Sequence, residues 1–177
     1  RKAVAEANAW MNPALMGLAK GERSMCNWDE DSLTMAVEAS RDCLTGVERD
    51  QVGHVVFAST TMPFEDRQNS GVLSIALNLD RGISSMDVTS SQRAGTTALL
   101  SALDHTSSRA NGKVGKHALC AVADSRKALA ASPQELTFGC AGAAVTVGDE
   151  NVIAEYKGSY TVTDDFVDHY RGEGKSV

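Results

Sequence analysis

Short apolar runs rich in β-branched residues alternate along this sequence with segments of helical periodicity. The clearest run, residues 55–58, holds no polar residue, which is typical of a strand buried on both faces of a parallel sheet. Because strands that alternate with helices form layered sheets, the order predicts an α/β fold with a mixed, mostly parallel sheet. The expected strands cover 52–58, 83–89, 117–123, 143–147 and 152–162, and the expected helices cover 3–11, 32–44, 70–79 and 95–106.

Length and charge exclude several classes of protein. The chain has 177 residues, enough for one domain with a buried core. No stretch reaches the roughly 20 apolar residues that a membrane span needs, so we expect no membrane partner. The net charge is −6 and the basic residues are scattered, which argues against binding to nucleic acid. The chain starts at Arg1 rather than Met, and we expect a fragment or a processed or trimmed chain.

The four cysteines form no C-x-x-C pair. A zinc site is therefore not expected, and no other metal site is predicted. Cys120 lies in an apolar run and Cys140 lies between glycine and alanine, so both are interpreted as small buried hydrophobic residues rather than disulfide partners. Unbridged cysteines indicate a reducing compartment, and we expect the cytoplasm.

The segment from 87 to 99 carries the most chemical information. It predicts a buried strand, a tight turn and a helix of small residues. Such a turn holds one side chain at a helix N-terminus, where backbone N–H groups and the helix dipole favour negative charge. A cysteine at that place would be driven toward the thiolate and become a strong nucleophile.

This segment resembles the nucleophile motif of the 3-hydroxy-3-methylglutaryl-CoA synthases and the type III ketoacyl synthases. That motif runs Asp, two residues, a small pair, Cys, and then a glycine-containing turn that leads into a small-residue helix. Asp87 matches its start, and the cysteine position falls on Gln92. Segments similar to other parts of these synthases lie at 21–31, 55–61, 138–145 and 160–170, so the resemblance covers nearly the whole chain.

The resemblance implies a thiolase-like fold of which this chain supplies one half. Residues 1–177 are then the N-terminal half of a thiolase-like domain, layered helix–sheet–helix and lacking the first strand, with a loose tail at 172–177. The substrate would be a coenzyme A thioester, with no separate cofactor. The expected partners are acyl-CoA or an acyl-carrier thioester, a homodimer mate or a chain that supplies the second half of the fold, and, as for some relatives, a small zinc-ribbon, OB-fold protein.

The same resemblance assigns the candidate site residues. Gln92 occupies the nucleophile position without a thiol, and Thr60 occupies the position of the family's acid/base glutamate. Arg93, Gly139 and Gly142 are the candidate substrate-binding residues. From the residues alone, Gln92 is better explained as a polar loop residue that satisfies backbone groups, and Gly139 and Gly142 as turn glycines with positive φ.

An amide is not a usable nucleophile at neutral pH, so we expect an acyl-CoA or acyl-carrier handling subunit without condensing activity of its own. Three alternatives stay open. Gln92 resembles the glutamine of decarboxylating ketosynthases, whose amide donates a hydrogen bond to the thioester carbonyl. It is also consistent with an engineered trap in a still-active acyltransferase. The last alternative is a non-catalytic α/β binding module.

Overall fold

The computed structural model describes residues 1–107 and 117–165, and the predicted tail at 172–177 lies outside them. The chain divides into two compact units. We call residues 24–126 and 139–148 the sheet unit, and residues 1–23, 127–138 and 149–177 the helical unit. Within the described residues, no helix has the length and apolar character needed to span a membrane.

In its described residues, the helical unit contains three short helices, α1 (Lys2–Asn8), α2 (Leu15–Leu18) and α6 (Pro133–Thr137). Their shared core consists of Ala5, Leu15 and Leu136. The prediction of a strand over 152–162 is wrong. Apolar alternation alone does not make a strand, because its backbone groups need a neighbouring strand to bond with.

The sheet unit is built on four strands in the order β2-β1-β3-β4. β1 pairs in parallel with both neighbours, whereas β4 runs antiparallel to β3, so the predicted mixed, mostly parallel sheet is confirmed. The strands are β1 (Val52–Ala58), β2 (Ser84–Val88), β3 (His117–Ser125) and β4 (Cys140–Val147). The helices are α3 (Ser32–Cys43), α4 (Asn69–Ala76) and α5 (Ala94–Ser107), with a 3-10 turn, η1 (Arg49–Gln51).

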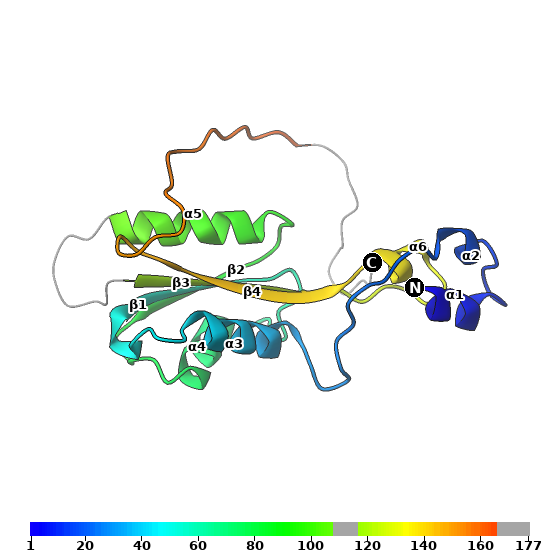
Figure 1. Cartoon of the computed structure of the whole chain (residues 1–177), viewed down its shortest axis with the longest axis horizontal. Coiled ribbons are helices and arrows are strands. Elements are labelled where there is room, and N and C mark those ends of the chain that lie inside the picture. Colours follow the sequence, from blue (N-terminus) through cyan, green and yellow to red (C-terminus); the bar gives the residue numbers. More distant parts are fainter. Residues whose placement is uncertain (108–116, 166–177) are drawn as a thin grey trace. The chain divides into compact units, whose positions relative to one another are not determined.

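Strand alternation sorts the core side chains onto two faces of this sheet. Val55 and Phe57 of β1 pack in one cluster with residues of α3 and α4, while Val56 and Ala58 pack in another with alanines of α5. Figure 1 shows the result within the sheet unit, with α3 and α4 on one face of the sheet and α5 on the other. Every residue of β1 is buried, as the unbroken apolar run predicted.

Asp87 holds the start of α4 against β2. Its carboxylate accepts hydrogen bonds from the backbone N–H of Asn69 at 2.7 Å and of Ser70 at 2.7 Å, and from the Asn69 side-chain amide at 3.0 Å. Burial raises the pKa of Asp87, but the hydrogen bonds from Ser70 and Asn69 outweigh it and lower this pKa overall. The residue before α4, Gln68, makes no side-chain cap, so Asp87 supplies the cap from another element.

A pair of histidines packs between β1 and α5. The rings of His54 and His105 stack with their centroids 4.1 Å apart, and His54 Nδ1 lies 2.7 Å from the Ser84 hydroxyl. His54 is buried. Burial, followed by the nearby His105, lowers the pKa of His54, so the folded state favours the neutral ring.

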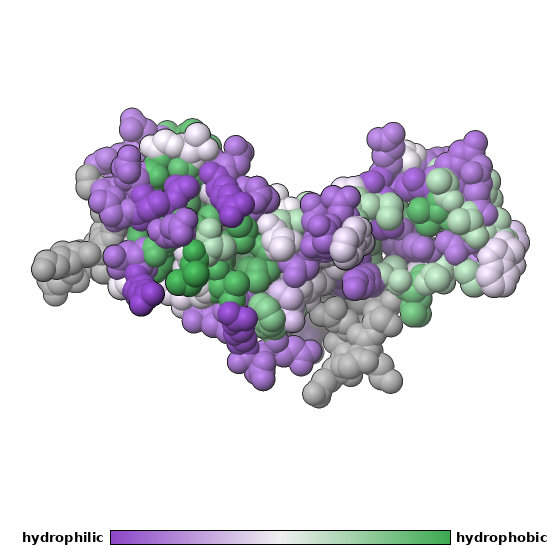
Figure 2. Space-filling model, turned by 90° about the horizontal axis from the view of Figure 1, so that it is seen from below, coloured by the Kyte–Doolittle hydropathy of each residue, from purple (hydrophilic) through white to green (hydrophobic). Residues whose placement is uncertain are grey.

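The surface of the sheet unit on the α3 and α4 side, opposite α5, carries both hydrophobic and hydrophilic residues. Figure 2 shows hydrophobic residues scattered among hydrophilic ones over this face. Ile75 of α4 is among the exposed large hydrophobic side chains of this unit. Isolated exposed side chains of this kind are normal on protein surfaces.

Replacing Asp87 with Asn should destabilise the sheet unit by about 1–2 kcal/mol, because the charged acceptor for two backbone donors at the start of α4 is lost. Urea unfolding followed by circular dichroism would measure the change. Asp29→Asn, at an exposed position, is the matched control and should change stability little. Equal effects of the two substitutions would contradict the capping role.

Stability should fall as the pH drops from about 7.5 to about 5.5, because unfolded His54 takes up a proton near its ordinary pKa while the folded ring stays neutral. The stabilisation is fully present above the unfolded pKa and is lost toward the lowered folded pKa. His54→Asn keeps a partner for Ser84 but does not titrate, so its free energy of unfolding should change less over this range. Identical pH slopes in urea unfolding would contradict the assignment.

Candidate functional site

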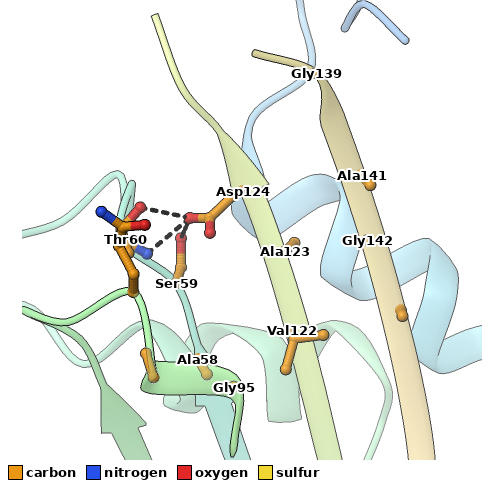
Figure 3. Close-up of a pocket in the computed structure, with 13 residues that line it drawn as sticks. Ala58, Ser59, Thr60, Gly95, Val122, Ala123, Asp124, Gly139, Ala141 and Gly142 are labelled. Carbon is orange, nitrogen blue, oxygen red and sulfur yellow. Dashed lines mark hydrogen bonds between the residues drawn. The ribbon is translucent and has the colours of Figure 1, made fainter. Parts of the chain in front are cut away.

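A pocket of about 350 Å³ opens at the carboxyl ends of β1 and β3, beside the start of α5 and the first residues of β4. This volume lies within the range of small-molecule sites. Figure 3 shows β3 and β4 side by side at the pocket, with lining residues drawn as sticks. The lining residues are Ala58, Ser59, Thr60, Gln92, Ala94, Gly95, Val122, Ala123, Asp124, Gly139, Ala141, Gly142 and Ala143.

Small residues dominate the pocket wall. Ala141 and Ala143 of β4 are exposed, and the strand leaves this face open because α5 packs mainly over β1 and β3. Val122 supplies the largest apolar side chain of the lining. The wall is therefore apolar, and its side chains project little from the backbone. An apolar group could lie along it close to the backbone.

The turn between β2 and α5 carries Gln92 to this pocket. Ser90 has a φ of +67°, which a residue with a β-carbon rarely adopts. Ala94 then donates its backbone N–H to the Ser91 carbonyl at 2.9 Å, which closes the turn directly before the helix. The sharp reversal places Gln92 among the lining residues at the N-terminal end of α5.

Asp124 is the only acidic residue of the lining, and it ties β3 to the end of β1. One of its oxygens, Oδ1, accepts hydrogen bonds from the Thr60 backbone N–H at 2.7 Å and the Thr60 hydroxyl at 2.9 Å. The hydroxyls of Ser59 and Thr61 donate to the same oxygen at 3.1 and 3.3 Å. Figure 3 shows Asp124 reaching from β3 toward Ser59 and Thr60. The carboxylate thus fixes three consecutive residues at the polar rim.

Gly139 and Gly142 have a different role from the turn glycines expected from sequence. Neither has a positive φ. A β-carbon on Gly142 would lie 2.9 Å from the Met35 carbonyl oxygen, and one on Gly139 would lie 2.8 Å from the Ser24 hydroxyl. The prediction of positive φ was therefore wrong. Gly142 lies within β4 and lets this strand approach Met35 of α3, and Gly139, just before β4, leaves room for Ser24.

The structure brings together four of the five residues named from sequence. Gln92, Thr60, Gly139 and Gly142 line one pocket, although they come from separate segments. Arg93 is exposed and does not line it. Sequence reasoning missed Asp124. The available signal was a carboxylate directly after the apolar run of the third strand, where parallel strands end together.

None of the lining residues is a cysteine. Cys120 is buried as predicted, and burial raises its pKa to about 11, which keeps the thiol protonated near neutral pH. Cys140 is only half-buried, so its assignment as a buried residue was wrong. Its side chain contacts Ser125, on the sheet face turned toward α3.

Comparison with known proteins gives hydroxymethylglutaryl-CoA synthases among the relatives of this chain. The chain is 31% identical over 161 residues to the hydroxymethylglutaryl-CoA synthase of Methanocaldococcus jannaschii, covering 90% of this chain and 46% of that enzyme. It is 33% identical over 171 residues to the synthase of Caldivirga maquilingensis, covering 93% of this chain and 48% of that enzyme. No family model matches the sequence. The chain thus spans about half the length of the curated relatives it matches.

Solved structures agree on the fold. MvaS in complex with 3-hydroxy-3-methylglutaryl coenzyme A superposes with a TM-score of 0.69 at 22% identity, over 83% of this chain and 35% of that one. The HMG synthase of the curacin biosynthetic pathway, in complex with holo donor-ACP, gives a TM-score of 0.71 at 19% identity, over 84% and 37%. These likenesses show a thiolase-like fold. The chain therefore has a thiolase-like fold and is similar, over about half of their length, to the hydroxymethylglutaryl-CoA synthases.

Proposed function

We propose that this chain binds an acyl thioester in the pocket at the carboxyl end of its sheet, without forming an acyl-enzyme there. One observation carries the proposal: Gln92, which the resemblance assigns to the family's nucleophile position, lines the same pocket as Thr60, Gly139 and Gly142. The lining contains no thiol, and an amide does not attack a thioester at neutral pH. Binding without acylation is the activity that these side chains support.

The chemistry of the lining suits the two ends of such a ligand. The apolar wall of Ala58, Val122 and Ala143 suits a short acyl chain, because burial of apolar area stabilises binding. The Gln92 amide has two N–H donors, and a thioester carbonyl is an acceptor without a donor of its own. The amide would therefore orient the carbonyl at the place where the synthases carry out acylation.

The rim differs from the resembled family in where its carboxylate stands. Thr60, at the position of the acid/base glutamate, is a hydrogen-bond donor to Asp124. The pocket thus keeps one carboxylate, delivered from β3 rather than from the end of β1. Since Oδ1 of Asp124 already accepts several hydrogen bonds, we assign this group first to holding the rim and orienting the ligand.

The proposed partners rest on the likeness to the synthases, of which the chain spans about half. As protein partners we propose a homodimer mate or a chain that supplies the second half of the fold. We keep both coenzyme A and an acyl-carrier protein as carriers, because similar structures are complexes with each. A zinc-ribbon, OB-fold partner remains part of the proposal, and the cytoplasm remains the proposed compartment, since unbridged thiols are typical of a reducing environment.

A second candidate is decarboxylation of a malonyl-type thioester. It is favoured by the same amide donor, because a hydrogen bond to the thioester carbonyl stabilises the enolate that forms when carbon dioxide leaves. No nucleophilic side chain is needed for this reaction.

Radiolabelled acetyl-CoA should bind the wild-type chain reversibly and leave no covalent label on the peptide that covers residues 87–97, because Gln92 offers no nucleophile. Gln92→Cys should gain label on that peptide, since a thiol at this helix start is activated. Gln92→Ala, the matched control, should stay unlabelled and bind about fivefold more weakly for loss of one hydrogen bond. Peptide mapping and equilibrium dialysis give both readouts. Label on the wild-type peptide would contradict the proposal.

Carbon dioxide release from malonyl-CoA distinguishes the second candidate. If the amide acts on the enolate, the wild-type chain should release carbon dioxide about 100-fold faster than Gln92→Ala, as is typical when one such donor is removed. Malonyl-CoA labelled in its free carboxyl carbon, with the released carbon dioxide trapped as bicarbonate, measures the rate. Equal rates in the two proteins would remove decarboxylation and leave binding alone.

A further inference from the structure

Two cysteines far apart in sequence lie side by side in the sheet unit, away from the pocket. Cys140, the first residue of β4, stands directly opposite Ser125, the last residue of β3, in the antiparallel register. The Ser125 hydroxyl lies 3.7 Å from the Cys140 sulfur and 3.1 Å from the Cys26 sulfur. One small side chain thus bridges the two thiols.

The surroundings leave this thiol pair able to react. Both cysteines are half-buried rather than enclosed, so a small reagent in solution can reach them. Cys26 lies in a segment, residues 19–31, that has neither helix nor strand, and its backbone is therefore not fixed by a sheet ladder. On its other side the Cys26 sulfur contacts the Met35 thioether of α3 at 3.9 Å.

We propose that Cys26 and Cys140 form a reversible disulfide when the protein meets a low-molecular-weight disulfide such as glutathione disulfide. The pair is an oxidation site distinct from the pocket, because Asp124 faces the pocket while Ser125, next in the strand, faces the thiols. This inference does not depend on acyl binding.

The reaction balances as two thiol–disulfide exchanges. The Cys26 thiolate attacks one sulfur of glutathione disulfide, whose S–S bond breaks and releases one glutathione thiolate. The Cys140 thiolate then attacks the Cys26 sulfur of the mixed disulfide and releases the second glutathione. Two protein thiols are oxidised, one glutathione disulfide is reduced to two thiols, and the two protons leave with them.

The closeness of the two sulfurs favours this outcome over two separate adducts, because the second thiol attacks within the same molecule. Burial, then the side-chain contact with Cys140, raises the pKa of Cys26, so the exchange runs faster at alkaline pH, where more of the thiolate forms. The remaining cysteines are poorer partners, because Cys120 is buried on the opposite face of the sheet and Cys43 packs against Thr146, further along β4.

The test is to incubate the full chain in a glutathione redox buffer, block remaining thiols by alkylation, digest the protein and map disulfides by mass spectrometry. Two of the four cysteines should become protected from alkylation. They should appear as one disulfide-linked peptide pair, Cys26–Cys140, which dithiothreitol reduces. Cys43→Ser, the matched control, should give the same yield. Cys26→Ser and Cys140→Ser should lose the cross-link and carry a glutathione adduct on the remaining partner.

The proposal is overturned if Cys26 and Cys140 stay reduced, if both end as separate glutathione adducts, or if the cross-links match the mixture formed in urea. Circular dichroism before oxidation shows that each variant is folded. Because the readout is the position of the disulfide, failure here leaves the acyl-binding proposal untouched, and failure of acyl binding leaves this one untouched.

Discussion

The arrangement of the pocket end of the sheet depends on the hydrogen bonds that the Asp124 carboxylate accepts. Parallel strands end in open backbone groups, and the residues that follow them are free to splay unless something binds them. Here one oxygen atom holds the backbone and hydroxyl of Thr60 together with the hydroxyls of Ser59 and Thr61. Thr61 in turn accepts the Ser125 backbone N–H at 2.9 Å. The rim of the pocket and the position of the thiol pair on the other face thus share one support.

The two faces of the sheet divide the chemistry of the protein. On the α5 side, small residues and a turn with positive φ at Ser90 form a pocket whose lining contains no cysteine. On the α3 side, sulfur atoms gather where glycine lets β4 approach closely. Side-chain alternation along β3 separates the two, because Asp124 and Ser125 are neighbours in sequence and point to opposite faces.

Much of this arrangement could be predicted from the sequence, and the misses have physical causes. The strands β1 to β4 and the helices α3 to α5 were recoverable, because apolar run length and helical spacing report burial directly. The convergence of Thr60 and Gln92 followed from the resemblance. Asp124 was missed because a polar residue at a strand end is common. Only its hydrogen bonds to residues distant in sequence distinguish it. The nearness of Cys26 to Cys140 is likewise a property of sheet register, which no local pattern encodes.

The contact between Gly142 and the Met35 carbonyl has a mechanical consequence. With no side chain between them, the backbone of β4 and the backbone of α3 touch directly, and close-packed surfaces transmit displacement rather than absorb it. Any side chain at position 142 would therefore push α3 away from the sheet and open the core cluster that α3 shares with β1.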